Sequence, residues 1–179
     1  QVATPAPKAA AKPQSATTGA GQDQPAGRAP ASSVAAKSRS ASLFFVRIDE
    51  DGRMVLWDVK RQVPFSDSPL LDSLAALLKG PGEAEIRKKL ISLVPQGTLL
   101  LSARVQGSTA VLDFSEAFMF NHFGIDGYVG QLKQVVYTAT SFPTVQDVQI
   151  LIDGKKKNYL AGEGVYIGRP LSRNSFPRE

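Results

Sequence analysis

The chain has 179 residues, and a folded domain usually takes roughly 100 to 200, so a single folded unit is expected. It has no cysteines, which excludes disulfides, thiolate catalysis and cysteine-bound metal sites. The net charge of +5 would favour an anionic partner. However, residues 1–40 hold five basic residues against one acidic residue, so the remainder is nearly neutral and no nucleic-acid partner is predicted.

No segment of the sequence predicts a membrane span. A membrane helix needs roughly 20 apolar residues in a row, and the most apolar run, LISLVPQGTLLL, is interrupted by Pro95, Gln96 and Gly97. The sequence begins with Gln1 rather than Met, which leaves open a signal peptide or anchor upstream. We therefore expect contact with a membrane only through such an upstream anchor.

Residues 1–41 are dominated by Ala, Pro, Ser, Gly and Gln and contain almost no large apolar side chains. Such a composition cannot bury enough surface to order the chain, so a disordered linker is predicted. As a flexible coil, about 40 residues would give an r.m.s. reach of roughly 35 Å. The linker would serve as a tether, and an unstructured extension without a purpose is the alternative.

A β-hairpin is predicted where order begins, at Leu43. The β-rich runs LFFVRI and RMVLWDV are joined by the acidic turn residues 49–52, which end in a glycine.

Two helices are predicted after the hairpin. The first is expected at about 68–79, where leucines recur at helical spacing between a Ser-Asp-Ser-Pro start and a Gly-Pro stop. The second is expected at about 83–93, because acidic residues fill its first turn, basic residues follow, and Pro95 ends it.

Two strands, a helix and a strand are predicted next. The strands at about 98–106 and 109–114 are separated by Gly107-Ser108 and form a hairpin. Alternating apolar residues of the first strand are expected on one face: Leu99, Leu101, Ala103 and Val105. A helix at about 127–142 follows from apolar spacings of three and four, and a strand at about 145–153 ends at an Asp-Gly turn.

The order of these elements gives an α+β fold with an αββαβ core, preceded by the N-terminal hairpin. The segments KKKNYL and VYI, after residue 154, predict short C-terminal edge strands. The predicted domain covers residues 42–174, and residues 175–179 form a tail.

Candidate catalytic residues are few. Asp113, Ser115 and the single histidine, His122, lie close in sequence, but a triad needs a base beside a nucleophile in space. Ser115 also suits a helix N-cap, and a lone histidine usually serves structure or surface. A hydrolase that uses His122 remains an alternative, but no enzyme and no catalytic residue are predicted.

No metal or cofactor site is predicted either. Asp49, Glu50 and Asp51 share one turn without the ligand spacing of a closed calcium loop. The glycines of residues 124–130 lack the strand before them and the Gly-Lys-Ser/Thr after them that a phosphate loop requires.

Two clusters could contact a partner. Lys155, Lys156 and Lys157 could touch phosphate, anionic lipid or acidic glycan, but a solvated turn or a charged edge that prevents strand pairing is favoured. The aromatic residues between 114 and 123 are expected in the core, and several of them exposed would instead mark a partner surface. They are Phe114, Phe118, Phe120 and Phe123.

Motifs distributed over nearly the whole ordered region resemble the GerMN domain of sporulation, spore-germination and other bacterial envelope proteins. They are the hairpin Phe44–Val59, LAALLKGP at 74–81, PQGT with LLLSARV at 95–105, AVLDFSEAF at 110–118, QVVYTATSFPTVQDVQILIDG at 134–154, AGEG at 161–164 and RPLSR at 169–173. The family is similar in fold to the ring-building motif, an αββαβ unit, which agrees with the element order predicted above.

The resemblance implies a non-catalytic, extracytoplasmic interaction or scaffold domain, held by a lipid or a membrane helix. Such a domain would help assemble an envelope, sporulation or germination complex, in the periplasm or on the outer face of the cytoplasmic membrane. Its implied partners are components of that complex or peptidoglycan, and a homo-oligomer is left open. A peptidoglycan- or glycan-binding module is the alternative function, and no cofactor is implied.

Overall fold

The structure, a computed structural model, describes residues 37–160, 162 and 164–176. The chain divides into two units, residues 1–34 and 35–179, and every described residue belongs to the second. Most of the predicted linker therefore lies outside the described residues.

The N-terminal hairpin is longer than predicted. Strand β1 spans Ser38–Ile48 and pairs antiparallel with β2, Met54–Pro64, along its whole length. The hairpin thus begins at Ser38 rather than at Leu43, and the last residues assigned to the linker belong to a strand. The first residues of β1 are mostly polar, so periodicity did not reveal them, but β2 supplies a paired backbone for each.

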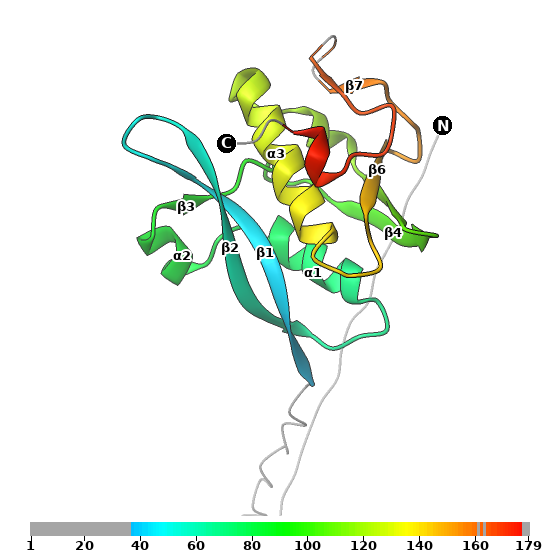
Figure 1. Cartoon of the computed structure of the whole chain (residues 1–179), viewed down its shortest axis with the longest axis horizontal. Helices are drawn as coiled ribbons and strands as arrows, with labels where there is room; N and C mark the ends of the chain where they lie inside the picture. Colours follow the sequence, from blue (N-terminus) through cyan, green and yellow to red (C-terminus); the bar gives the residue numbers. More distant parts are fainter. Residues whose placement is uncertain (1–36, 161, 163, 177–179) are drawn as a thin grey trace, which may run out of the picture. The chain divides into compact units, whose positions relative to one another are not determined.

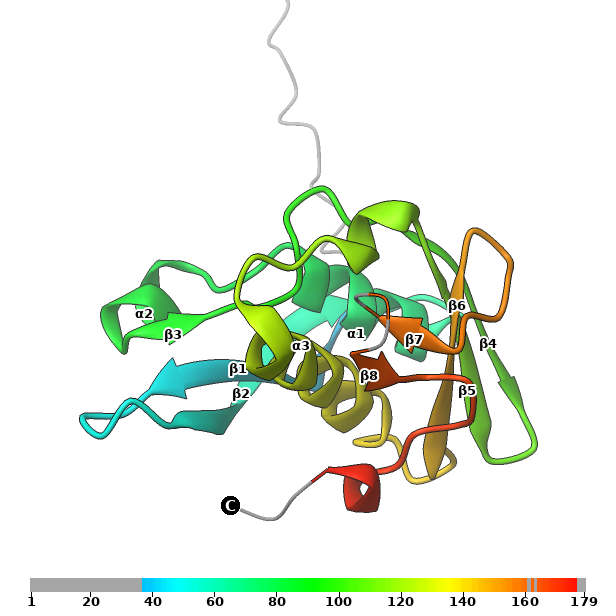
Figure 2. The same ribbon diagram turned by 90° about the horizontal axis from the view of Figure 1, so that it is seen from above.

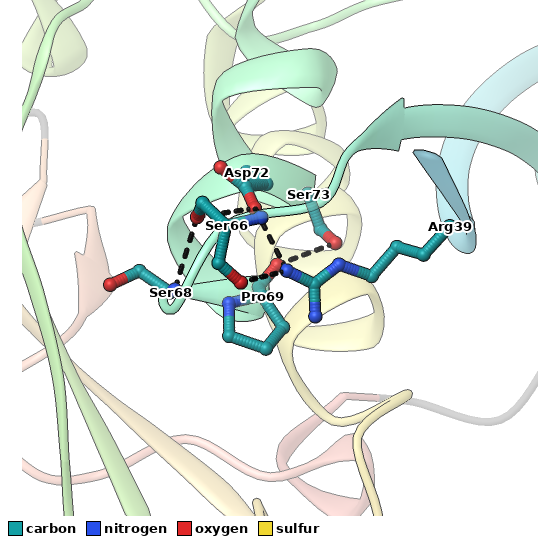
Figure 3. Close-up of polar contacts among 6 residues, drawn as sticks. All are labelled: Arg39, Ser66, Ser68, Pro69, Asp72 and Ser73. Atoms are coloured by element: carbon teal, nitrogen blue, oxygen red, sulfur yellow. Dashed lines mark hydrogen bonds and ion pairs between the residues drawn. The ribbon is translucent and has the colours of Figure 1, made fainter. Parts of the chain in front are cut away.

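A polar cluster ties the start of β1 to helix α1, which spans Pro69–Leu78. The predicted cap, Ser68, occupies the N-cap position but its hydroxyl makes no capping bond. Instead, Ser66 Oγ donates to Asp72 Oδ2 (2.7 Å) and accepts from the Ser68 N–H (3.0 Å). Arg39 Nη2 lies 3.1 Å from the same Asp72 oxygen, so an ion pair joins the hairpin to the helix start (Figure 3).

The second predicted helix is wrong beyond Arg87. Helix α2 spans only Glu83–Arg87, and Leu90–Ile91 form the short strand β3, which pairs with β1. Lys89 has φ of 60°, in the left-handed region that interrupts a helix. Pairing with β1 and burial of Leu90 therefore override the local helical preference.

The αββαβ core is confirmed. Strands β4 (Leu100–Gln106), β5 (Thr109–Phe114) and β6 (Asp147–Ile152) form one sheet in the order β4-β5-β6. β4 and β5 are antiparallel, whereas β5 and β6 are parallel. The crossover between these parallel strands contains helix α3, Gly124–Ala139, which begins and ends three residues earlier than predicted.

Of the four residues expected on the apolar face of β4, only Ala103 packs against the core. Leu99, Leu101 and Val105 are exposed, and the pairing of β4 with β5 shifts between Leu100 and Ser102. A bulge at an edge strand redirects side chains, and here it leaves Leu101 without a partner on β5.

The C-terminal strands form a separate sheet instead of extending the main one. β7 (Tyr159–Leu160) pairs only with β8 (Val165–Tyr166), and Lys155–Lys157 precede β7 rather than belonging to it. A short 3-10 helix, η2, spans Arg173–Ser175. Phe176 is buried, so the packed region extends past the predicted boundary at 174.

Helix α3 lies between the β1–β2 hairpin and the β4-β5-β6 sheet (Figures 1 and 2). Large side chains from every layer fill the core, and the largest of those that are fully buried are Leu43, Phe45, Leu74, Leu77, Leu90, Leu112, Phe114, Phe118, Leu132, Ile150, Ile152 and Leu160. Burial of this apolar surface is the main source of stability.

Buried polar side chains on α3 fix the hairpin against it. Gln134 accepts from the Leu93 N–H (2.7 Å) and donates to the Phe44 carbonyl (3.1 Å). Thr138 Oγ1 accepts from the Phe44 N–H (3.1 Å). Each bond satisfies a backbone group near the core, and together they define the position of β1 along the helix.

Candidate functional site

The three candidate catalytic residues do not assemble. Asp113 Oδ1 accepts from the Gly154 N–H (2.8 Å), and Ser115 Oγ accepts from the Leu99 N–H (3.0 Å). His122 is exposed. Within the described part of the chain, no hydrogen bond joins any two of these three side chains, so the geometry of a nucleophile beside a base is not formed.

The acidic turn is closed by its own carboxylate. Asp49 Oδ1 accepts from the backbone N–H groups of Asp51 (3.0 Å) and Arg53 (2.7 Å), which is a typical use of aspartate in a turn. Among residues 37–160, 162 and 164–176, no three His, Cys, Asp or Glu side chains gather in an arrangement that could hold a metal ion.

The glycine-rich segment belongs to helix α3 and serves close packing. A Cβ at Gly130 would lie 2.3 Å from Leu93 Cδ1, and one at Gly127 would lie 2.5 Å from Phe123 Cβ. These glycines let neighbouring side chains approach the helix backbone, and they do not form a loop that could surround a phosphate.

The aromatic segment divides into two halves. Phe114 and Phe118 are fully buried, with their rings stacked at 4.4 Å between centroids, as predicted for core residues. Phe120 and Phe123 are 59% and 62% exposed, so their predicted core position is wrong. Ile125, in the first turn of α3, is 64% exposed. We refer to Phe120, Phe123 and Ile125 as the exposed apolar patch.

The backbone that carries this patch is held in place by hydrogen bonds. The Tyr128 hydroxyl donates to the Met119 carbonyl (2.7 Å) and accepts from the Asn121 N–H (3.2 Å). Gln131 donates to the Phe118 carbonyl (2.7 Å) and accepts from Asn121 Nδ2 (3.0 Å). Hydrogen bonds therefore hold the segment that presents the patch outward. This segment begins at the 3-10 helix η1, Glu116–Met119.

A groove lies beside the patch, between the hairpin tip and the first half of α3. Its volume is about 640 Å³, and its apolar lining includes Val46, Met54, Leu56 and Val129. Ile125 lies one helical turn before Val129, which lines the groove, so this member of the patch lies near one end of the groove.

The charges along the groove are balanced. Asp49 and Asp126 line it together with Arg53 and Lys133. A lining with two acidic and two basic side chains gives no net attraction for an anionic surface. It suits a partner surface that has an apolar centre and a polar rim.

No helix among the described residues has the length and apolar character needed to cross a membrane.

The Germane family, described as "Sporulation and spore germination", matches residues 42–158. The chain belongs to this family. The match covers most of the hairpin, the αββαβ core and the segment before β7, so the resemblance predicted from the distributed motifs is confirmed. No curated protein matches the chain in a sequence comparison.

Solved structures of GerMN domains share the fold. The tandem GerMN domains of the sporulation protein GerM from Bacillus subtilis match with a TM-score of 0.65 and 19% identity, over 85% of this chain and 50% of that chain. The first GerMN domain of GerM matches with a TM-score of 0.59 and 22% identity, over 76% of this chain and 98% of that one.

A candidate lipoprotein from Clostridium perfringens also matches, with a TM-score of 0.54 and 20% identity, over 76% of this chain and 89% of that chain. At these identities the likeness concerns the fold alone. The chain spans half the length of the tandem GerM structure, which corresponds to one of its two domains.

Proposed function

We propose that the folded unit is a non-catalytic, extracytoplasmic interaction domain of a tethered bacterial envelope protein. It binds a protein partner through the exposed apolar patch and the groove beside it, and in this way helps assemble an envelope complex. The observation that carries the proposal is the patch itself: three large apolar side chains within six residues, each about 60% exposed.

Exposing these apolar side chains to water costs free energy, and the fold does not require their exposure. Phe114 and Phe118, only a few residues earlier, are fully buried, so the same segment places other aromatic residues in the core. Aromatic side chains in a contiguous exposed group mark interaction surfaces, because each gains free energy when a partner removes it from water. The hydrogen bonds around Asn121 support a preorganised surface, which lowers the entropy cost of binding.

The balanced charge of the groove favours a protein as the partner. An anionic lipid surface or a nucleic acid would require a cationic face, whereas Asp49 and Asp126 offset Arg53 and Lys133. A partner segment with apolar side chains at its centre and charges of both signs beside them would complement this lining.

The comparisons support the proposed location. The family is described by sporulation and spore germination, one structural relative is a candidate lipoprotein, and another is a sporulation protein. A lipid or membrane anchor upstream of residue 1 would hold the domain at the membrane, with the Ala- and Pro-rich N-terminal region as its tether. The absence of a nucleophile–base pair among Asp113, Ser115 and His122 supports a non-catalytic role.

Chemical cross-linking in producing cells, followed by identification of the captured proteins, tests this function. We expect extracytoplasmic envelope proteins to be captured by the wild-type chain and to be lost from a Phe123→Ser variant. Phe65→Ser is the matched control, because Phe65 is 59% exposed and follows the far end of β2, an 11-residue strand that begins at the hairpin tip.

Capture of cytoplasmic proteins alone would contradict the proposed location. Equal capture by the wild type and the Phe123→Ser variant would contradict the proposed surface. A Phe123→Leu variant, which keeps an apolar side chain, is expected to retain the partner and so separates loss of apolar contact from general damage.

A further inference from the structure

A second group of exposed side chains lies on the β7–β8 hairpin. Tyr159 and Tyr166 are directly paired across the two strands, and each is 44% exposed. Their ring centroids lie 5.3 Å apart with an interplanar angle of 65°, so the rings meet edge to face. Two short strands thus present an aromatic corner to solvent.

Polar groups gather beside this corner. A Cβ at Gly168 would lie 2.7 Å from the Tyr166 hydroxyl and 2.9 Å from Asn158 Oδ1, so these two polar atoms lie over the same bare backbone position. Within the described residues, neither the Tyr166 hydroxyl nor the Asn158 side-chain amide has a hydrogen-bond partner. Both residues are exposed, and Gly168 leaves the space in which the two polar atoms meet.

Basic residues flank the same hairpin. Residues 153–169 contain four basic residues against two acidic ones, a net charge of +2. Lys155, Lys156, Lys157 and Arg169 are all exposed. The three lysines precede β7 and so do not protect its edge, but they follow the turn at residues 153–154 and are exposed, as expected for a solvated turn.

We propose that this hairpin is a binding site for an anionic glycan. The apolar C–H faces of a sugar ring can pack on the tyrosine rings, and the Asn158 amide and Tyr166 hydroxyl can hydrogen-bond its hydroxyl groups. The neighbouring lysines would pair with carboxylate or phosphate groups along the polymer. Cell-wall carboxylates and wall-bound phosphate polymers share this chemistry.

The site is separate from the patch proposed to bind protein, since it uses β7, β8 and the segment before them. Aromatic corner, unpaired polar groups and net positive charge occur together here, whereas the groove beside α3 has balanced charge. A domain with both surfaces would bind its protein partner while touching the wall polymer.

Co-sedimentation of the purified full chain with purified cell walls tests the site, with one wall sample intact and another extracted to remove phosphate polymers. We expect saturable retention at low salt. Replacement of both Tyr159 and Tyr166 by Ala should weaken it by at least about fivefold, since an aromatic contact contributes roughly 1 kcal/mol. Retention by extracted walls identifies carboxylate as the ligand, and its loss identifies phosphate.

Three further variants keep the test decisive. The triple variant Lys155→Gln, Lys156→Gln, Lys157→Gln should weaken retention and reduce its salt dependence. Gly168→Ala should weaken retention although it removes no charged group and no aromatic ring, because the new Cβ displaces Asn158 and Tyr166. Arg87→Gln with Lys88→Gln, on α2 at the opposite side of the folded unit (Figures 1 and 2), removes two charges and should have no effect.

No retention of the wild type at low salt would overturn the proposal. So would full retention by the tyrosine variant, or equally strong binding to single-stranded DNA, because both results would reduce the site to a nonspecific cationic surface. The Phe123→Ser variant should retain wall binding, so failure of this site and failure of the protein-binding function are distinguishable.

Discussion

Two halves of one short aromatic segment behave oppositely. Phe114 and Phe118 stack against each other in the core, whereas Phe120 and Phe123 stand in solvent beside Ile125. The halves are separated by only one residue and each contains two phenylalanines, so the type of aromatic residue does not explain the difference.

Hydrogen bonding explains why the first half is buried and the second exposed. Beyond Phe118, backbone groups bond to side chains of α3 and of Asn121 instead of continuing a strand or a long helix. This arrangement turns the chain away from the core and presents its aromatic residues outward. The first half therefore contributes to stability, whereas the second is the surface proposed to bind a partner, and the variants below test that division.

Phe118→Ala should have the largest effect on stability. It removes a fully buried ring that stacks on Phe114, and such truncations typically cost about 3–5 kcal/mol. Urea denaturation followed by Trp57 fluorescence measures the free energy of unfolding. A Phe118→Leu variant should lose less, and a loss below about 1 kcal/mol for Phe118→Ala would contradict the assignment of this half to the core.

Asn121→Ala should have an intermediate effect, because Asn121 lies within the exposed half but bonds it to the rest of the fold. It removes side-chain bonds to the Leu93 carbonyl (2.9 Å), Gln131 (3.0 Å) and the Phe123 N–H (2.8 Å). We expect a loss of about 1–3 kcal/mol together with faster amide hydrogen exchange around Phe123. Unchanged exchange would mean that these bonds do not hold the patch in place.

Arg39→Ala tests whether the ion pair between Arg39 and Asp72, which lies outside the aromatic segment, stabilises the fold independently of that segment. Its ion pair with Asp72 is partly buried, so we expect a loss of about 1 kcal/mol, smaller at high salt. Thermal unfolding at low and high salt measures this change. Because the ion pair lies at the far end of the hairpin from the groove, cross-linking from the patch should be unchanged.

Phe123→Ser should have the smallest effect on stability, within about 0.5 kcal/mol, because an exposed side chain loses little packing when it is replaced. The same denaturation measurement applies, with Phe65→Ser as its control. A loss comparable to that of Phe118→Ala would show that Phe123 packs against the protein, and would remove the distinction between the halves.

Much of the fold could be predicted from the sequence because its signals are local. Leucine spacing identified α1, alternation and a Gly-Ser turn identified β4 and β5, and the order of elements gave the αββαβ core. The errors concern long-range pairing. The polar start of β1 is ordered by β2, and Leu90–Ile91 become a strand only because β1 lies beside them.

The candidate sites were less predictable, since exposure depends on tertiary contacts. Nothing local distinguishes Phe118 from Phe120, and their separation arises from bonds to Tyr128 and Gln131. The aromatic corner depends on the pairing of Tyr159 with Tyr166, which is seven residues away in sequence. The lysine run and the two tyrosines are visible in the sequence. That the two tyrosines lie on the same face of the hairpin follows only from the register of the strands.

The most direct test places a photo-reactive phenylalanine analogue at position 123, and separately at position 65, and maps the adducts formed in producing cells. The account predicts one discrete adduct with an extracytoplasmic protein from position 123, lost when Ile125 is changed to Asp, and no such adduct from position 65. Indistinguishable labelling from the two positions would contradict the assignment of the exposed apolar patch as a partner-binding surface.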